Sequence, residues 1–163
     1  MIRRLQQSDA AAYRTVRLDA LRLHPEVFGS SYEEESQYPL AEFARFISPP
    51  DTVIGAFAGD RLVGISGIYV SRKLKQQHKG HIVGVYVDAA HRRAGLARKL
   101  VEVVIAEARQ AQLRLVQLSV TVGNEAARRL YVRMGFQTYG IERRALLVGE
   151  TYFDEELMAL ALD

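Results

Sequence analysis

One segment constrains the fold more than any other, because it joins two apolar stretches through an arginine-rich turn. The run "HIVGVYV" at residues 81–87 is apolar on both faces, which is typical of a buried strand. The turn "HRRAGLARK" follows, and apolar residues then recur at helical spacing over residues 95–110. An alternating run at residues 113–122 predicts the next strand. A strand–helix–strand unit of this kind requires a parallel pair and a right-handed crossover.

The remaining elements place this unit in a mixed sheet. Helices are predicted at residues 9–23, with Ser8 as the cap, at residues 39–47, and at residues 124–134, where Gly135 provides the turn. Further strands are predicted at residues 52–58 and 61–70, as a hairpin, and on both sides of Gly149. Residues 72–80 are polar and predict a loop. We therefore expect an α/β fold in which helices flank a central, twisted, mixed sheet.

Length and composition limit the class of protein. The 163 residues, 48% of them hydrophobic, fit a single domain spanning residues 1–163. No apolar run approaches the ~18 residues that span a bilayer, and no secretory signal is visible. The absence of cysteine excludes disulfides, zinc–thiolate sites and a cysteine nucleophile. We expect a cytoplasmic protein with no membrane partner.

The arginine-rich turn is suited to binding an anion. A helix start presents unpaired N–H groups and the positive end of the helix dipole, and Gly95 allows close approach to its backbone. Arg92, Arg93 and Arg98 add positive charge around it. Pyrophosphate fits this description, yet neither G-x-x-x-x-G-K-[ST] nor G-x-G-x-x-G occurs in the chain. A solvated surface turn is the alternative interpretation.

Two segments resemble the GNAT family of N-acetyltransferases. The six residues "RRAGLA" at 92–97 match that family's signature R/Q-x-x-G-x-G/A, with alanine at the last position. The stretch "VGVYVDAAHRRAGLARKLV" resembles its coenzyme-binding strand, loop and helix, and "LSVTVGNEAARRLYVRMGF" resembles its later strand and helix. "SSYEEE" and "YFDEELMALAL" are also similar to members of the family, so the resemblance covers nearly the whole chain.

The resemblance implies a fold and a reaction. Two parallel strands splay apart, the pantetheine arm enters the gap, and acetyl-CoA gives its acetyl group directly to a primary amine of a small molecule or peptide. The reaction runs in a ternary complex without a covalent enzyme intermediate. The residues implied in binding the coenzyme are Val85, Tyr86, Val87, Arg92, Arg93, Ala94, Gly95, Leu96, Ala97, Arg98, Asn124, Ala127 and Tyr131. A backbone N–H near Val85 would steady the oxyanion.

Catalytic roles follow from the same comparison. Asn124, Ala127 and Tyr131 fall on one face of the predicted helix, and the resemblance places that face beside the coenzyme. Tyr131 would donate a proton to the leaving thiolate, since a free tyrosine has a pKa near ~10 and a thiol near ~8.5. A core aromatic on an amphipathic helix is the alternative for Tyr131. We include Asn124 with it among the catalytic candidates.

The acceptor amine must lose a proton, so a base is needed. Glu33, Glu34, Glu35 and His81 are the candidates, of which we select Glu33 and His81; a solvated charge run and an edge histidine are the alternatives. His78 and His81 lack a third ligand, so we predict no metal.

The acceptor and the protein class stay partly open. Acidic clusters at residues 33–35 and 154–156 favour a cationic acceptor amine. A pI of 9.3 and the basic segment at residues 72–99 raise nucleic-acid binding as another class, but no such motif occurs and we expect no nucleic-acid partner. A non-catalytic acyl-CoA sensor is the third class. A homodimer is implied by resemblance only.

Overall fold

One seven-stranded sheet runs through the computed structural model, which describes all 163 residues. The strand order is β1-β2-β3-β4-β5-β7-β6, and only the β4–β5 pair is parallel. The strands are β1 (Ile2–Arg4), β2 (Thr52–Ala58), β3 (Arg61–Val70), β4 (Lys79–Val87), β5 (Leu115–Thr121), β6 (Gln137–Val148) and β7 (Thr151–Ala161). The mixed, helix-flanked sheet expected from the sequence is confirmed.

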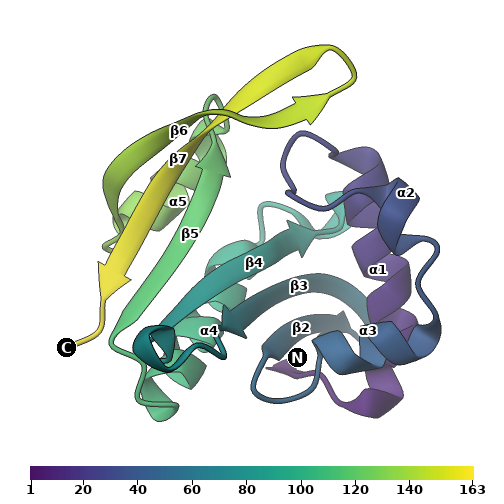
Figure 1. Cartoon of the computed structure of the whole chain (residues 1–163). Helices are drawn as coiled ribbons and strands as arrows, with labels where there is room; N and C mark the ends of the chain where they lie inside the picture. Colours follow the sequence, from purple (N-terminus) through teal and green to yellow (C-terminus); the bar gives the residue numbers. More distant parts are fainter.

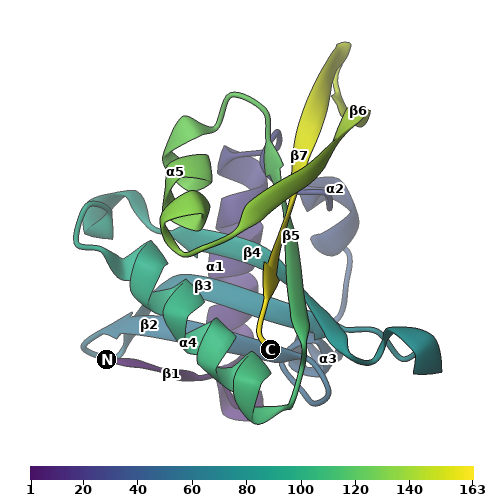
Figure 2. The ribbon, with the colours of Figure 1, turned by 90° about the vertical axis from the view of Figure 1, so that its left-hand side faces the viewer.

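Helices cover both faces of this sheet (Figures 1 and 2). They are α1 (Ala10–Leu23), α2 (Tyr32–Glu35), α3 (Leu40–Phe46), α4 (Leu96–Gln110) and α5 (Glu125–Arg133). Leu100 and Val104 of α4 and Tyr131 of α5 belong to one buried cluster. Ala20 of α1 and Phe43 of α3 belong to a second. The two clusters form the core on opposite sides of the sheet, so the strands are held rigidly between them.

The parallel strands β4 and β5 separate soon after they meet. Their pairing extends only over Lys79↔Leu115, Gly80↔Val116 and His81↔Gln117, and the strands then diverge into a V (Figure 1). Gly80, at the base of the V, leaves room for the Ile68 side chain of β3, because a β-carbon on Gly80 would lie 2.5 Å from Ile68 Cδ1. The expected splay is confirmed, and it leaves the facing backbone edges of residues 83–87 and 118–121 without a neighbouring strand.

A bulge in β4 changes which way its side chains face. Gly67 pairs with Val83 and Ile65 with Tyr86, so β4 contains one residue more than β3 over this step. Gly84 carries the bulge with a φ of +64°, a conformation that favours glycine. As a result Ile82 and Val87 face the α4 side of the sheet, whereas Tyr86 faces α1. Simple alternation would have put Ile82 and Tyr86 on the same face.

Several boundaries differ from the sequence prediction. Ser8 does not cap α1: a 3-10 turn at Gln7–Asp9 precedes the helix, and the Asp9 carboxylate accepts a hydrogen bond from the Gln6 N–H. The predicted loop at residues 72–80 contains a 3-10 turn and the start of β4. Strand β1 and helix α2 were not predicted, because three or four residues are too short to show a period.

Candidate active site

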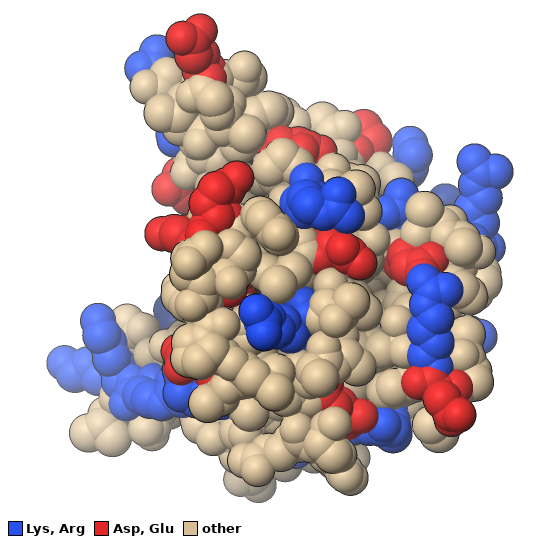
Figure 3. All heavy atoms as spheres, turned by 90° about the vertical axis from the view of Figure 1, so that its right-hand side faces the viewer, with Lys and Arg blue, Asp and Glu red and all other residues tan.

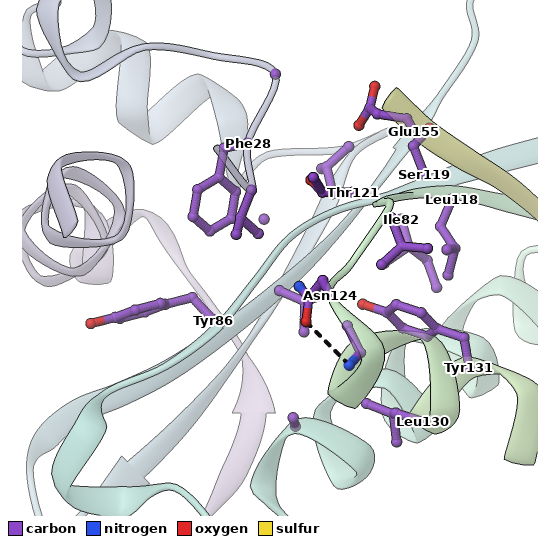
Figure 4. A pocket seen from close by; sticks show the side chains of 18 of the residues that line it. Phe28, Ile82, Tyr86, Leu118, Ser119, Thr121, Asn124, Leu130, Tyr131 and Glu155 are labelled. Carbon is purple, nitrogen blue, oxygen red and sulfur yellow. Dashed lines mark hydrogen bonds between the residues drawn. The ribbon is translucent and has the colours of Figure 1, made fainter. Parts of the chain in front are cut away.

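A cavity of about 480 Å³, here called the inner cavity, lies where β4 and β5 diverge. Its walls come from residues 81–87 of β4, residues 118–121 of β5 and one face of α5. Phe28 and its neighbours, in the segment between α1 and α2, close one side (Figure 4). Six helices and strands, together with their connecting segments, thus meet around a gap in the sheet. The sequence-predicted residues brought together there are His81, Val85, Tyr86, Val87, Arg92, Ala97, Asn124, Ala127 and Tyr131.

Two further cavities adjoin the inner one. The outer groove, about 600 Å³, shares Val85, Arg92 and Asn124 with it and also includes His24 and Gly123. The side cavity, about 310 Å³, shares Arg17, Ser30, Val83 and Gly84 with it and lies against α1, α2 and β3. The outer groove therefore adjoins the inner cavity at the carboxyl end of β4, and the side cavity adjoins it at the β4 bulge. This arrangement suits two substrates that enter from different sides.

The N-terminus of α4 is exposed and open. Gly95 caps the helix with a φ of +71°, and a β-carbon there would meet nothing within 4 Å. Arg93 also has a positive φ, +67°, and its side chain forms no ion pair. Successive N–H groups in such a turn converge on one point, which is the arrangement that binds phosphate oxygens. Protein side chains leave this tip accessible.

The other two arginines of the turn are already engaged within the protein. Arg92 donates from Nε to the carbonyl oxygen of Val87 at 2.9 Å, and its Nη2 lies 3.0 Å from His24 Nε2. Arg98 pairs with Glu102 on the next turn of α4. Arg92 thus fixes the path of the chain from β4 into the loop. Ala94, Arg93, Gly95, Leu96 and Arg98 lie outside the inner cavity, at or near the helix tip.

Helix α5 begins at the wall of the inner cavity. The Oδ1 atom of Asn124 accepts a hydrogen bond from the N–H of Ala127 at 3.4 Å, so Asn124 is the N-cap of the helix (Figure 4). This cap sets the direction in which the next two turns run. Asn124, Ala127 and Tyr131 face the cavity together, as their spacing predicted. Asn124 therefore has a structural role as the helix cap, whether or not it takes part in catalysis.

Tyr131 combines a buried ring with access to the cavity. Its side chain is 6% exposed and packs edge-on against Phe136 at 5.8 Å between ring centroids. The hydroxyl points into the space between Ile82 and Asn124, as Figure 4 shows. Burial raises the pKa of the Tyr131 hydroxyl to about 12. The phenol therefore stays protonated at any physiological pH and can only donate a proton or a hydrogen bond to a developing anion.

The four candidate bases occupy different places. His81 lines the inner cavity, and burial together with Lys79 lowers the pKa of His81 below its ordinary value of 6.5, which leaves the imidazole neutral at pH 7. Glu34 and Glu35 line the side cavity. Glu33 is exposed on α2 and lines none of these three cavities. Of the two candidates selected from the sequence, only His81 is brought to the gap.

Two residues of the acidic clusters are paired with arginines, and a third is held by a backbone N–H. Glu35 pairs with Arg17 and Glu156 with Arg128. Asp154 accepts a hydrogen bond from the N–H of Arg144. Figure 3 shows acidic and basic side chains mixed over the face that includes α1, α2 and α3. This face of the molecule therefore carries no continuous acidic surface.

Among the cavity residues that were not candidates from the sequence, three contribute charge or close a wall of the site. Glu155, on β7, lines the inner cavity, and burial plus the carboxylate of Glu142 raise the pKa of Glu155. Phe28 closes the cavity from the α1 side, and Arg17 lies between the inner and side cavities. Glu155 belonged to a recognised acidic cluster, so alternation along β7 could have identified it. Phe28 and Arg17 lie in segments without a motif.

Comparisons with known proteins identify the family. The sequence pattern of the acetyltransferase (GNAT) family matches residues 17–136. Over 130 residues, 78% of this chain and 78% of the relative, the sequence is 34% identical to N-alpha-acetyltransferase RimI of Mycobacterium tuberculosis. The chain belongs to the GNAT acetyltransferase family. It is an acetyl-CoA-dependent N-acetyltransferase, and this favours the enzyme over the acyl-CoA sensor and the nucleic-acid-binding protein.

Solved structures share the fold of this GNAT protein. A GNAT-family acetyltransferase from Streptococcus pneumoniae superposes with a TM-score of 0.86 at 24% identity, over 100% of this chain and 99% of that one. A Salmonella typhimurium protein solved with its cofactor acetyl-CoA superposes with a TM-score of 0.84 at 22% identity, over 100% and 94% of the two chains. None of the helices described here is long and apolar enough to cross a membrane.

The open tip of α4 generates a test of coenzyme binding. We expect Gly95→Val to weaken acetyl-CoA binding about tenfold, because a β-branched residue resists positive φ and displaces the N–H groups of the turn. Gly59→Val is the matched control, since Gly59 has a φ of +59°, equally free space and a place in the β2–β3 turn. Calorimetry on both variants checks this; equal affinities would contradict a role for the tip.

Proposed function

We propose that this acetyltransferase moves the acetyl group of acetyl-CoA directly to a primary amine of a small molecule or a peptide, in a ternary complex, with Tyr131 as the general acid. The observation that carries the proposal is the Tyr131 hydroxyl, which lies in the gap between β4 and β5 and has no hydrogen-bond partner in the protein. In the transfer, the amine nitrogen bonds to the thioester carbon and the carbon–sulfur bond breaks.

The gap accounts for how the coenzyme arm would bind. Backbone groups at residues 83–87 face no strand across the gap and can pair with the two amides of a pantetheine arm. The bulge at Gly84 offsets the adjacent N–H of Val85 from the β3 ladder, which suits a donor to the oxyanion of the tetrahedral intermediate. The exposed tip of α4 and the Arg93 side chain would hold the pyrophosphate.

Tyr131 acts mainly by stabilising charge on sulfur. A phenol with a pKa of about 12 is a weaker acid than a thiol near ~8.5, so complete proton transfer from Tyr131 alone is unfavourable. A hydrogen bond to the developing thiolate lowers the barrier as the carbon–sulfur bond breaks. The proton released from the new amide nitrogen passes to sulfur through the Tyr131 hydroxyl, so Tyr131 accepts one proton as it donates another and stays neutral.

His81 is our proposed base. The acceptor amine arrives as an ammonium ion and must lose one proton before it attacks. A neutral imidazole accepts that proton directly or through a water molecule, whereas Glu35 is already bound to Arg17. Support comes from the cavity position of His81 and from its lowered pKa, which keeps the imidazole in its basic form at neutral pH.

Similarity to a relative named for N-alpha-acetylation favours a peptide α-amine as the acceptor. The side cavity offers room for the residues that follow such an amine, with Tyr13, Tyr38 and Glu34 in its wall. A cationic acceptor remains compatible with the proposal, because the ammonium form of any amine is attracted to the carboxylates of Glu34 and Glu155.

Tyr131→Phe tests the general acid. We expect kcat to fall about 100-fold, with the KM for acetyl-CoA changed less than about threefold, because only the hydroxyl that meets the thiolate is lost. Tyr152→Phe on β7, where the side chain is exposed, is the control. Release of free coenzyme A with an alanyl peptide as acceptor gives the rates. A Tyr131→Phe enzyme as fast as wild type would remove Tyr131 from the chemistry.

The pH dependence of kcat tests His81. The base works only when neutral, and its pKa is lowered, so activity should persist from alkaline pH down to pH 6.5 and fall below that value. Tyr131, with a pKa of about 12, should cause no loss on the alkaline side up to about pH 10. His81→Gln should lower kcat and abolish the acid limb. If His81→Gln loses activity at acid pH as the wild type does, the acid limb of the profile belongs to another group.

A further inference from the structure

Arg17 occupies the junction between the two cavities. It lies on α1 and lines both the inner cavity and the side cavity, which share only three other residues, Ser30, Val83 and Gly84. Its side chain is 13% exposed, so the guanidinium is largely withdrawn from solvent. An acceptor that extends from the side cavity toward the β4 bulge must therefore lie next to this guanidinium.

Glu35 holds the guanidinium in one orientation. The Nε atom of Arg17 donates to both carboxylate oxygens at 3.2 Å, and Nη2 donates to Oε2 at 2.9 Å. Glu35 is 4% exposed, and the Arg17 guanidinium stacks 5.7 Å from the centre of the Phe28 ring. A buried bidentate pair of this kind fixes geometry as well as charge.

This arrangement leaves Nη1 free. Nε and Nη2 are used by Glu35, and Nη1 forms no hydrogen bond with the protein. A β-carbon built on Gly84 would lie 3.0 Å from Nη1, so the free amino group lies directly against the bulge of β4. Its two N–H donors are therefore held next to Val85, where the thioester is expected, and on the side from which an acceptor would enter.

We propose that the free Nη1 group of Arg17 binds the acceptor through a carbonyl oxygen on the carbon next to the amine-bearing carbon, so that the enzyme selects α-amino carbonyl compounds. This inference rests on the proposed function. A hydrogen bond at that oxygen fixes the position of the amine nitrogen, two bonds beyond the carbonyl carbon, so that the nitrogen faces the thioester carbon. Arg17 is in this role a substrate-binding residue that orients the nucleophile, with Glu35 as its positioning partner.

The charges at the junction support a carbonyl as the ligand. The Arg17–Glu35 pair has no net charge, so Glu35 does not attract a second cationic group of the acceptor. The free donors face the cavities, and a polyamine offers them no oxygen. A peptide N-terminus supplies one amine, which would give its proton to His81. It also supplies one adjacent carbonyl, which would accept a hydrogen bond from Nη1 of Arg17.

The experiment compares two acceptors that differ by the carbonyl. L-alaninamide carries it, and isopropylamine is the same branched amine with a methyl group in place of the carboxamide. In Arg17→Gln we expect kcat/KM for L-alaninamide to fall about 10- to 100-fold, as for loss of a hydrogen bond from a charged donor, and kcat/KM for isopropylamine to change less than about threefold. The dissociation constant of acetyl-CoA, from calorimetry, should stay within twofold.

Two further variants keep the result interpretable. Arg17→Gln combined with Glu35→Gln removes the uncompensated buried carboxylate and should show the same acceptor-dependent loss. Arg22→Gln removes an equal charge from an exposed position on α1 and should leave both acceptors unaffected.

Each other outcome has a definite meaning. Equal losses on both acceptors, in the single and the double variant, would make Arg17 a structural residue and overturn the inference. Weaker acetyl-CoA binding with unchanged acceptor preference would move Arg17 to the coenzyme and overturn it as well. If wild type acetylates isopropylamine and not α-amino carbonyl compounds, only the inference fails. If wild type acetylates no amine, the proposed function fails too.

Discussion

The separation of β4 from β5 is the constraint on which the site depends. Two adjacent parallel strands would normally satisfy each other's backbone groups along their whole length, but here only three residue pairs do so. Two buried clusters fix the sheet from opposite faces, and the N-cap at Asn124 directs α5 along the opening. The resulting gap contains free backbone donors and acceptors in a wall lined by more apolar than polar residues, which suits the amides and methylene groups of a pantetheine arm.

The chemistry at the gap is controlled by burial. Burial keeps Tyr131 protonated and His81 neutral, which gives one donor and one acceptor of protons at neutral pH. The same low-dielectric surroundings require that the Arg17 guanidinium be paired, and Glu35 provides that pairing while leaving one amino group free. The groups to which we assign catalytic and binding roles thus acquire their properties from the same packing that builds the core, and the proposed route includes no metal or covalent intermediate.

The sequence predicted the parts of the site that are coded locally. The signature around Gly95 and the spacing of Asn124, Ala127 and Tyr131 lie within single elements, so period and motif were sufficient. The bulge at Gly84 was not predicted, because the extra residue of β4 is defined only against β3. Arg17 was missed for a similar reason: its partner Glu35 lies 18 residues away, on a four-residue helix without periodicity. Glu33 looked equivalent to Glu35, yet it faces solvent.

Hydrogen–deuterium exchange on the wild-type protein, with and without coenzyme A, tests the central claim most directly. The account predicts that bound coenzyme A slows exchange at residues 83–87 of β4, whose edge faces the gap, and leaves residues 79–81, already paired with β5, unchanged. Protection at the N-terminus of α4 should accompany it. Coenzyme binding without slower exchange at residues 83–87 would show that the arm does not lie in the gap and would contradict the account.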